Sequence, residues 1–224
     1  MAGALNQRGI GMTSARTRAR MVARLRDQGI ADERVLGAMA SVPRHLFLDE
    51  ALASRAYEND ALPIGFGQTI SHPYVVARMI EFLLEKKAPG KALEVGTGCG
   101  YQAAVLAQIF PEVYSIERIK GLHERARRNL LGLRLANLRL VHGDGYAGLE
   151  QAAPFHSIIV AAAAPSVPEA LARQLAAGGR MILPLSDTHG QRLLLIERGR
   201  SERLGFTERA LDAVRFVPME AGKA

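Results

Sequence analysis

Residues 93–101 read Leu93-Glu-Val-Gly-Thr-Gly-Cys-Gly-Tyr101. A short apolar run leads into three alternating glycines, and a run of helix-forming residues follows them. Glycine lets the backbone turn tightly and approach a bound molecule closely, because it has no side chain to obstruct either. A helix that starts there also offers backbone N–H groups that lack a partner within the helix. The stretch therefore predicts a ligand-binding turn between a strand and a helix, with a purely structural turn as the alternative.

The segments that follow this turn alternate between strand and helix. Short apolar runs predict strands, and longer runs with apolar residues three or four positions apart predict helices. We expect strands at 92–95, 113–116, 138–141, 157–161, 180–183, 192–197 and 210–216, and helices at 101–109, 119–131 and 168–175. This alternation predicts an α/β fold with a mostly parallel central sheet and helices on both faces. Ligands in such folds bind at the carboxyl ends of the strands.

The chain ahead of the sheet reads differently. Apolar spacing predicts one helix over 16–28 and a second that Asp32 caps and Pro43 ends. Residues 57–74 contain two prolines and two glycines, which favour an extended or looping segment over a helix. An amphipathic helix is expected over 74–85. These elements predict a helical N-terminal extension to the sheet.

The glycine spacing differs from the two common nucleotide-binding motifs. A dinucleotide-binding turn would read G-x-G-x-x-G, but Tyr101 stands where its last glycine would be, and the chain has no G-x-x-x-x-G-K-[S/T] phosphate loop. The E-x-G-x-G-x-G form is instead similar to the first motif of the Rossmann-like class I methyltransferases. That resemblance implies a site for S-adenosylmethionine, and an acidic residue suits this cationic, phosphate-free cofactor. The residues expected to bind it here are Glu94, Gly96, Thr97, Gly98 and Gly100.

Two later strand ends carry acidic residues in the same order. Val113-Tyr-Ser-Ile-Glu117 ends in a carboxylate that can accept hydrogen bonds from both ribose hydroxyls. The alternative for Glu117 is a charge that stabilises the start of the next helix. In His142-Gly-Asp-Gly-Tyr146, we expect Asp144 to accept a hydrogen bond from the adenine amino group and Gly145 to contact the cofactor, with a simple Asp-Gly turn as the alternative. Three such motifs on consecutive strand ends favour the cofactor site.

The acceptor is indicated by a segment ahead of the sheet. Ala61-Leu-Pro-Ile-Gly-Phe-Gly-Gln-Thr-Ile-Ser-His-Pro-Tyr74 resembles the signature segment of the protein-L-isoaspartate O-methyltransferases. The similarity extends from about residue 16 to 219, and includes the glycine turn, Ser115–Leu122, His142–Gly145 and Val214–Pro218. In contrast, Ala162-Ala-Ala-Pro165 lacks the Asp/Asn-Pro-Pro-aromatic motif of many enzymes that methylate base or amide nitrogens. That difference weighs against an amino-group acceptor.

The resemblance implies a methyl transfer to the free α-carboxylate of L-isoaspartyl residues in damaged proteins, with S-adenosyl-L-homocysteine as the product. In the family, the Gln68-Thr69-Ile70-Ser71 segment lies beside the methyl group and its serine is the active-site residue. Ser71 and Thr69 are therefore the expected catalytic residues, and Gln68 to Ser71 are expected to contact the cofactor. The alternative for Ser71 is an N-cap of the following helix. His72 and Cys99 depart from the residues usual in the family.

The predicted chemistry needs few catalytic groups. An α-carboxylate has a pKa of about 3 to 4 and is already ionised at neutral pH, so no general base is required. The protein must hold the carboxylate oxygen in line with the methyl group and exclude water. This agrees with a sequence in which no His-Asp or Cys-His pair stands out.

The remaining composition limits other functions. The net charge is +7, and residues 1–40 hold seven arginines against three acidic residues. We interpret residues 1–14 as a solvated basic arm; a nucleic-acid contact and an organelle transit peptide are the alternatives. The single cysteine excludes an intramolecular disulfide, and the scattered histidines predict no metal site. Without a long apolar run or a secretory signal, we expect a cytoplasmic protein that contacts no membrane.

The expected domain organisation is a single methyltransferase domain over 15–219, flanked by the arm and a tail at 220–224. Within it, 15–90 forms the helical, substrate-side segment and 91–219 the cofactor-binding sheet. A monomer that binds isoaspartyl peptides and no nucleic acid is expected. Two other functions stay open: methyl transfer to RNA or another acceptor from the same cofactor site, and cofactor binding without turnover.

Overall fold

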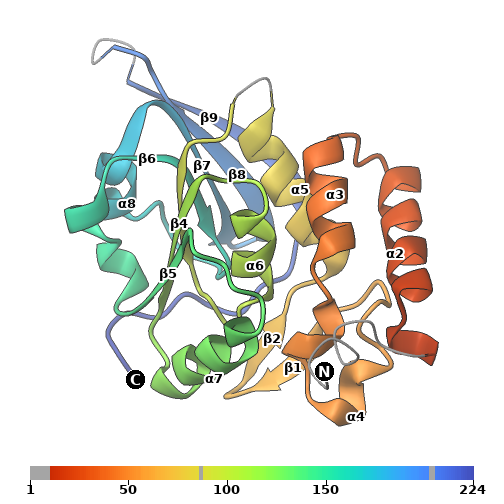
Figure 1. The fold of residues 1–224 in the computed structure, drawn as a ribbon. Helices are drawn as coiled ribbons and strands as arrows, with labels where there is room; N and C mark the ends of the chain where they lie inside the picture. The colour runs from red at the N-terminus through yellow and green to blue at the C-terminus, as the bar shows by residue number, and fades with distance from the viewer. Residues whose placement is uncertain (1–10, 86–87, 202–204) are drawn as a thin grey trace.

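The computed structural model of the protein describes residues 11–85, 88–201 and 205–224. Seven strands form the central sheet in the order β5-β4-β3-β6-β7-β8-β9 (Figure 1). The strands are β3 (Lys91–Val95), β4 (Glu112–Glu117), β5 (Leu138–His142), β6 (Phe155–Val160), β7 (Leu175–Asp187), β8 (Gly190–Arg198) and β9 (Phe206–Ala213). The pairs from β5 to β7 are parallel, whereas β8 runs antiparallel to both of its neighbours. The mostly parallel sheet is confirmed.

Helices cover both faces of the sheet, as predicted. They are α2 (Ala15–Asp27), α3 (Glu33–Ser41), α4 (Glu50–Ala53), α5 (Pro73–Leu84), α6 (Tyr101–Ala107), α7 (Lys120–Leu131) and α8 (Glu169–Gln174), with 3-10 turns η1 (Gly11–Thr13), η2 (Arg44–Phe47), η3 (Gly145–Ala147) and η4 (Glu150–Ala152). Strand side chains alternate between two cores. In β6, Ile159 joins the core beneath α5, α6 and α7, while Ile158 and Val160 join the core beneath α8.

The N-terminal helices form an outer layer rather than a separate unit. Helices α2 and α3 lie side by side, and α3 packs against α5 (Figure 1). Asp32 caps α3 as predicted, because its side chain accepts a hydrogen bond from the Arg34 backbone N–H at 2.9 Å. The expected arm over 1–14 falls partly outside the described residues. Its last residue, Ser14, caps α2 by accepting a hydrogen bond from the Thr17 N–H at 3.3 Å.

The segment predicted to be extended or looping contains a small hairpin. Strands β1 (Leu62–Gly65) and β2 (Gln68–Ile70) pair antiparallel, with Leu62 opposite Ile70. Arg125 of α7 holds this hairpin in place by donating a hydrogen bond to the Ile64 carbonyl at 2.7 Å. Helix α5 begins three residues after the hairpin, so its position also fixes the hairpin.

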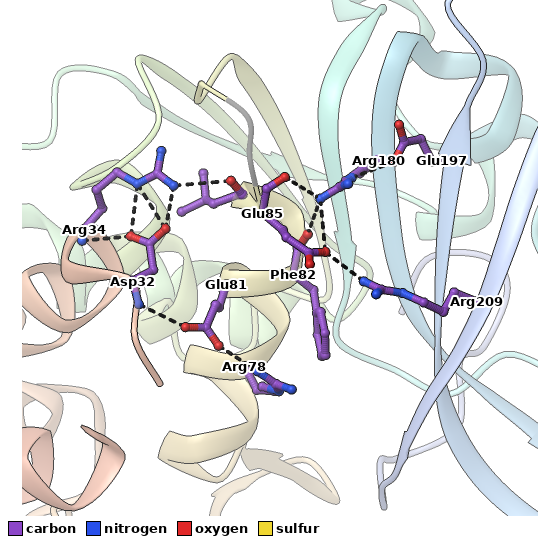
Figure 2. A network of polar contacts seen from close by, with 10 residues as sticks. Asp32, Arg34, Arg78, Glu81, Phe82, Glu85, Arg180, Glu197 and Arg209 are labelled. Atoms are coloured by element: carbon purple, nitrogen blue, oxygen red, sulfur yellow. Dashed lines mark hydrogen bonds and ion pairs between the residues drawn. The ribbon is translucent and has the colours of Figure 1, made fainter. Parts of the chain in front are cut away.

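A network of polar contacts fixes the far end of α5 to the sheet (Figure 2). Arg180 of β7 donates to the carbonyls of Phe82 and Glu85 at 3.0 and 2.8 Å, and to the Glu197 carboxylate at 2.9 Å. The Glu85 carboxylate also accepts a hydrogen bond from Arg209 of β9 at 2.8 Å. These bonds satisfy carbonyls that lack partners at a helix end. They hold α5 against the antiparallel edge of the sheet.

Two strand predictions were wrong at their boundaries. Strand β7 begins at Leu175 and continues to Asp187, because its second half forms a long hairpin with β8. Strand β9 covers 206–213 rather than 210–216. It is an edge strand with almost all of its residues exposed, so no alternation of buried and exposed positions marks its boundaries. Among the described residues, no helix has the length and apolar character required to cross a bilayer.

Candidate functional site

A pocket lies where the parallel strands end. It encloses about 870 Å³ of space, part of which is open to solvent. Its walls come from the β1–β2 hairpin, the turns after β3, β4 and β6, and the segment after β9. The predicted residues that line it are Gln68, Thr69, Ile70, Ser71, Gly96, Thr97, Gly98, Glu117 and Gly145. The structure thus brings the acceptor segment and the cofactor turn together.

The glycine turn has the conformation that its sequence predicts. Gly96, Gly98 and Gly100 have φ values of +93°, +56° and +92°, a region that side chains disfavour. The Gly96 and Thr97 N–H groups both donate to the Ile116 carbonyl, at 2.9 and 3.2 Å. Gly100 does not line the pocket; it begins α6, and a Cβ there would lie 3.0 Å from Leu130 Cδ1. Gly100 therefore shapes the turn, and its predicted contact with the cofactor stays a prediction.

Glu117 links the glycine turn after β3 to the start of α7. Its side chain is buried, and its Oε2 accepts a hydrogen bond from the Gly98 N–H at 2.8 Å. Its Oε1 accepts one from the Ile119 N–H at 2.9 Å, just ahead of α7. Each carboxylate oxygen has a further lone pair, so both can still accept from a hydroxyl. The role at the helix start and the predicted ribose contact are therefore compatible.

Glu94 lies behind the pocket wall rather than on it, so the predicted direct contact with a ligand is absent from this geometry. Its side chain is fully buried, and Ser115 Oγ donates a hydrogen bond to its Oε2. Thr97 Oγ1 lies 2.6 Å from the same Ser115 hydroxyl, and Thr97 lines the pocket. Burial raises the pKa of Glu94 to about 8. Glu94 therefore acts on the pocket through Ser115 and Thr97.

Asp144 also lies outside the pocket lining, although Gly145 forms part of it. Asp144 Oδ1 accepts a hydrogen bond from the Tyr146 N–H at 2.9 Å and begins the turn η3. Asp144 Oδ2 accepts a second from the Gly222 N–H at 2.8 Å. The Asp-Gly turn expected as the alternative is thus present. The contact with adenine stays a prediction.

The hairpin segment presents polar groups to the pocket. The Ser71 hydroxyl has no hydrogen-bond partner among the residues that the structure describes, and both Ser71 and Thr69 line the pocket. The N-cap of α5 is His72, with Pro73 at the first helical position. The interpretation of Ser71 as the helix cap was therefore wrong. Its hydroxyl is free to bind a ligand.

Two ionisable side chains beside the hairpin are held in their protonated forms. Burial raises the pKa of the Cys99 thiol to about 11 and that of the Tyr101 hydroxyl to about 12. Both residues line the pocket. A neutral thiol is a poor nucleophile, and neither group can accept a proton at neutral pH. Among the described residues, no group of three acidic, histidine or cysteine side chains is arranged to hold a metal ion.

Several lining residues were not singled out by the sequence. Arg118 and Ile119 follow β4, and Ala161 and Ala162 follow β6. The rule that sites form at the carboxyl ends of parallel strands could have identified these four. The fourth wall consists of Val217, Pro218, Met219 and Glu220; the first two belong to a segment that resembles the family, whereas no comparable rule points to the last two.

The C-terminal residues from Glu220 onward are held by residues that follow β4 and β5. Arg118 donates to the Glu220 carboxylate at 2.6 Å, and the Lys120 N–H donates to the Ala224 carbonyl at 2.6 Å. The Gly222 N–H bond to Asp144 closes the arrangement. The segment predicted as a tail therefore packs over the start of α7 and the end of β5.

The pocket fits S-adenosylmethionine by its chemistry. Glu117 offers hydroxyl acceptors, while Ile116, Ile119 and Met219 offer an apolar wall for a base. Glu117 is the acidic side chain on the pocket wall, whereas Glu94 lies behind the turn, where burial favours its neutral form. No phosphate-binding cation cluster is needed for S-adenosylmethionine.

Comparisons with known proteins agree with this arrangement. Residues 16–224 match the family model of protein-L-isoaspartate(D-aspartate) O-methyltransferase. The chain is 61% identical over 214 residues to the protein-L-isoaspartate O-methyltransferase of Bordetella parapertussis, covering 95% of this chain and 82% of the relative. It is 57% identical over 218 residues to that of Chromobacterium violaceum, covering 97% of this chain and 96% of the relative.

Solved structures show the same fold. A Plasmodium falciparum protein, described under the same family name and solved in complex with S-adenosyl-L-homocysteine, superposes with a TM-score of 0.80 at 26% identity. The superposition covers 91% of this chain and 98% of that one. Its bound ligand is the product of methyl transfer from S-adenosylmethionine. Sequence, fold and pocket agree, and the chain belongs to the protein-L-isoaspartate(D-aspartate) O-methyltransferase family.

Proposed function

We propose that the protein transfers a methyl group from S-adenosylmethionine to the free α-carboxylate of L-isoaspartyl residues, as a step in the repair of damaged proteins. The observation that carries this proposal is the joining of two segments across one pocket. The family-specific residues Gln68 to Ser71 form one wall, and the glycine turn 96–98 forms another. A methyltransferase for another acceptor would need the second segment but not the first.

Some residues of the pocket bind the cofactor, and others orient the acceptor. When bound, the cofactor supplies a methyl group on a positively charged sulfur, which leaves as a neutral thioether when the carboxylate oxygen bonds to the methyl carbon. Glu117 and the glycine turn hold the nucleoside part, and Thr97 extends the chain of hydroxyls that ends at Glu94. No proton is transferred, which agrees with the protonated states of Cys99 and Tyr101.

Ser71 and Thr69 are the proposed catalytic residues, because their side chains can touch the acceptor. The Ser71 hydroxyl can donate a hydrogen bond that orients the carboxylate. Weak orienting bonds serve better than strong ones, because strong stabilisation of the ground-state anion would lower its reactivity. Orientation and exclusion of water then supply most of the acceleration.

The partners follow from the same chemistry. Isoaspartyl peptides and proteins are the acceptors, and no metal is required. We infer a monomer in the cytoplasm, in which residues 15–219 act as one catalytic domain and the basic N-terminal residues take no part in methyl transfer.

The test is methyl transfer from labelled S-adenosylmethionine to two peptides that differ only in an isoaspartyl or an aspartyl linkage. Selective labelling of the isoaspartyl peptide is expected. Equal labelling of both peptides, or of neither while calorimetry shows intact cofactor binding, would contradict the proposed acceptor. Labelling of RNA in the same assay would instead support the alternative acceptor.

A further inference from the structure

A fully buried arginine near the pocket has no carboxylate partner. Arg44 is 0% exposed, and its Nε donates to the Ala56 carbonyl at 2.9 Å. Its Nη2 donates to the Asp60 carbonyl at 3.4 Å, whereas its Nη1 has no hydrogen-bond partner among the described residues. Removing a charge from water is costly, so buried cations are normally paired with an anion. Among the residues that the structure describes, no carboxylate therefore forms an ion pair with Arg44.

The position of Arg44 connects it to the acceptor wall of the pocket. Its guanidinium carbon lies 4.8 Å from the ring centroid of Tyr101, and that ring lines the pocket. The electrostatic influence of Arg44 also reaches His72, which directly follows Ser71. Burial and the charge of Arg44 lower the pKa of His72, so the imidazole is neutral and adds no second charge. The His72 Nδ1 is also buried without a partner.

The acidic side chains expected at the cofactor lie elsewhere, and the carboxylate of the neighbouring Asp60 is ion-paired to Arg55 at 3.1 Å. Glu94, Glu117 and Asp144 stand at or near the ends of β3, β4 and β5, on the segments expected to hold the cofactor. A guanidinium stays protonated in proteins even when burial lowers its pKa, as it does here. The pocket thus has an acidic side chain, Glu117, beside the cofactor turn, and a buried cation, Arg44, against the ring of Tyr101.

We propose that Arg44 is a positioning residue that selects an anionic acceptor: its unpaired charge, acting through Tyr101 and the hairpin end, favours a carboxylate at Ser71 over a neutral group. This inference rests on the proposed function, and Arg44 is the group that would distinguish a charged acceptor from a neutral one. Arg44 does not touch the acceptor, because it is fully buried. Its effect is electrostatic and acts through the Tyr101 ring, because a protein interior screens charges less than water does.

The experiment measures discrimination rather than activity. Two peptides differ in one group: an isoaspartyl peptide with its free α-carboxylate, and the same peptide with that group as a neutral carboxamide. Their Kd values are measured by calorimetry with the protein saturated in S-adenosyl-L-homocysteine. The ratio of the two Kd values is compared between the wild type, Arg44→Met and Arg44→Lys.

We expect Arg44→Met to reduce the preference for the carboxylate about tenfold, equivalent to about 1.4 kcal/mol. Arg44→Lys should retain the preference within about threefold, because the charge remains. Arg34→Met is the control. It removes one positive charge from an arginine that is ion-paired to Asp32 and lies outside the pocket lining, and should leave the ratio unchanged. If Arg44 had only a structural role, its replacement would weaken the binding of both peptides equally and leave the ratio of their Kd values unchanged.

Two results would overturn the inference. One is an unchanged ratio in a folded Arg44→Met protein, or in Arg44→Gln if circular dichroism shows that the methionine variant does not fold. The other is an Arg44 variant whose peptide ratio is unchanged but which no longer prefers S-adenosyl-L-homocysteine over the analogue that lacks its carboxylate. The charge of Arg44 would then act on the carboxylate of the cofactor rather than on the acceptor. Labelling of isoaspartyl peptide by the wild type is measured in parallel, so failure of the proposed function is seen separately.

Discussion

Replacing Glu117 by glutamine changes one oxygen to an NH₂ group and removes one negative charge. Both Glu117 oxygens already accept backbone hydrogen bonds, from the Gly98 N–H at 2.8 Å and the Ile119 N–H at 2.9 Å. In Glu117→Gln, whichever way the amide turns, its NH₂ must face one of these N–H donors. The glycine turn or the start of α7 therefore loses an acceptor.

The size of the effect follows from the bonds that are lost. A hydrogen bond to a charged group contributes about 1.5–3 kcal/mol. If Glu117 holds the ribose hydroxyls, the substitution removes at least one such bond from the complex, which corresponds to a roughly 10- to 150-fold increase in Kd. The unliganded protein should also lose about 1–3 kcal/mol of its free energy of unfolding, because a buried N–H is left without an acceptor.

Calorimetry of S-adenosyl-L-homocysteine binding measures the first quantity, and urea unfolding without ligand measures the second. Glu112→Gln is a matched control, since Glu112 begins the same strand β4 at the end away from the pocket. Its Kd should equal that of the wild type. A Glu117→Gln protein that is folded and binds with wild-type affinity would refute the ribose assignment, even if its stability falls.

Three further predictions use other residues. Ser71→Ala should lower the rate of methyl transfer at least tenfold and leave S-adenosyl-L-homocysteine affinity and stability within about 0.5 kcal/mol, since Ser71 caps no helix; unchanged turnover in a peptide assay would remove its catalytic role. Glu94→Gln should become more stable relative to the wild type as pH rises from about 4.5 to 8. The pKa of this carboxyl group is about 8 in the native state and about 4.3 in the unfolded chain. Between these two values the wild type therefore loses about 1.4 kcal/mol of its free energy of unfolding per pH unit, and the glutamine variant does not. A difference in stability between the two proteins that is the same at pH 5 and pH 8, measured by urea titration, would contradict this. Arg180→Met should lower the free energy of unfolding by about 2–4 kcal/mol, because it removes three hydrogen bonds from a side chain that is 12% exposed. The half-exposed Arg209→Met should lower it by no more than about 1 kcal/mol, and equal losses would show that the network in Figure 2 is not organised around Arg180.

The sheet and the cofactor turn could be predicted because local sequence determines them. Ile158, Ile159 and Val160 are all apolar because a parallel strand is covered on both faces. The turn at 96–100 required glycine for its positive φ values, and Glu117 ends its strand as expected. These features depend on neighbours along the chain, which a pattern can show.

The features that were missed depend on contacts between distant residues. Glu94 has the spacing of a ligand-binding acid, but spacing does not say whether a side chain lies on the wall or behind it. The bond between Asp144 and Gly222 joins residues that are 78 positions apart. The apolar residues on either side of Arg44 do not indicate whether its own charged side chain would be fully buried. Each of these depends on the packing of the completed fold.

The walls of the pocket include residues 68–71, in the first third of the chain, and residues 217–220, close to its C-terminus. A ligand that binds there can bind only when both segments are docked, so its binding energy adds to the stability of the whole fold. At a ligand concentration about 1,000 times the Kd, this linkage is worth about 4 kcal/mol. Amide hydrogens of the hairpin and of the C-terminal segment should then exchange more slowly together, although they lie far apart in sequence. The supply of cofactor in the cell would in this way govern how long each copy of the protein resists unfolding and proteolysis.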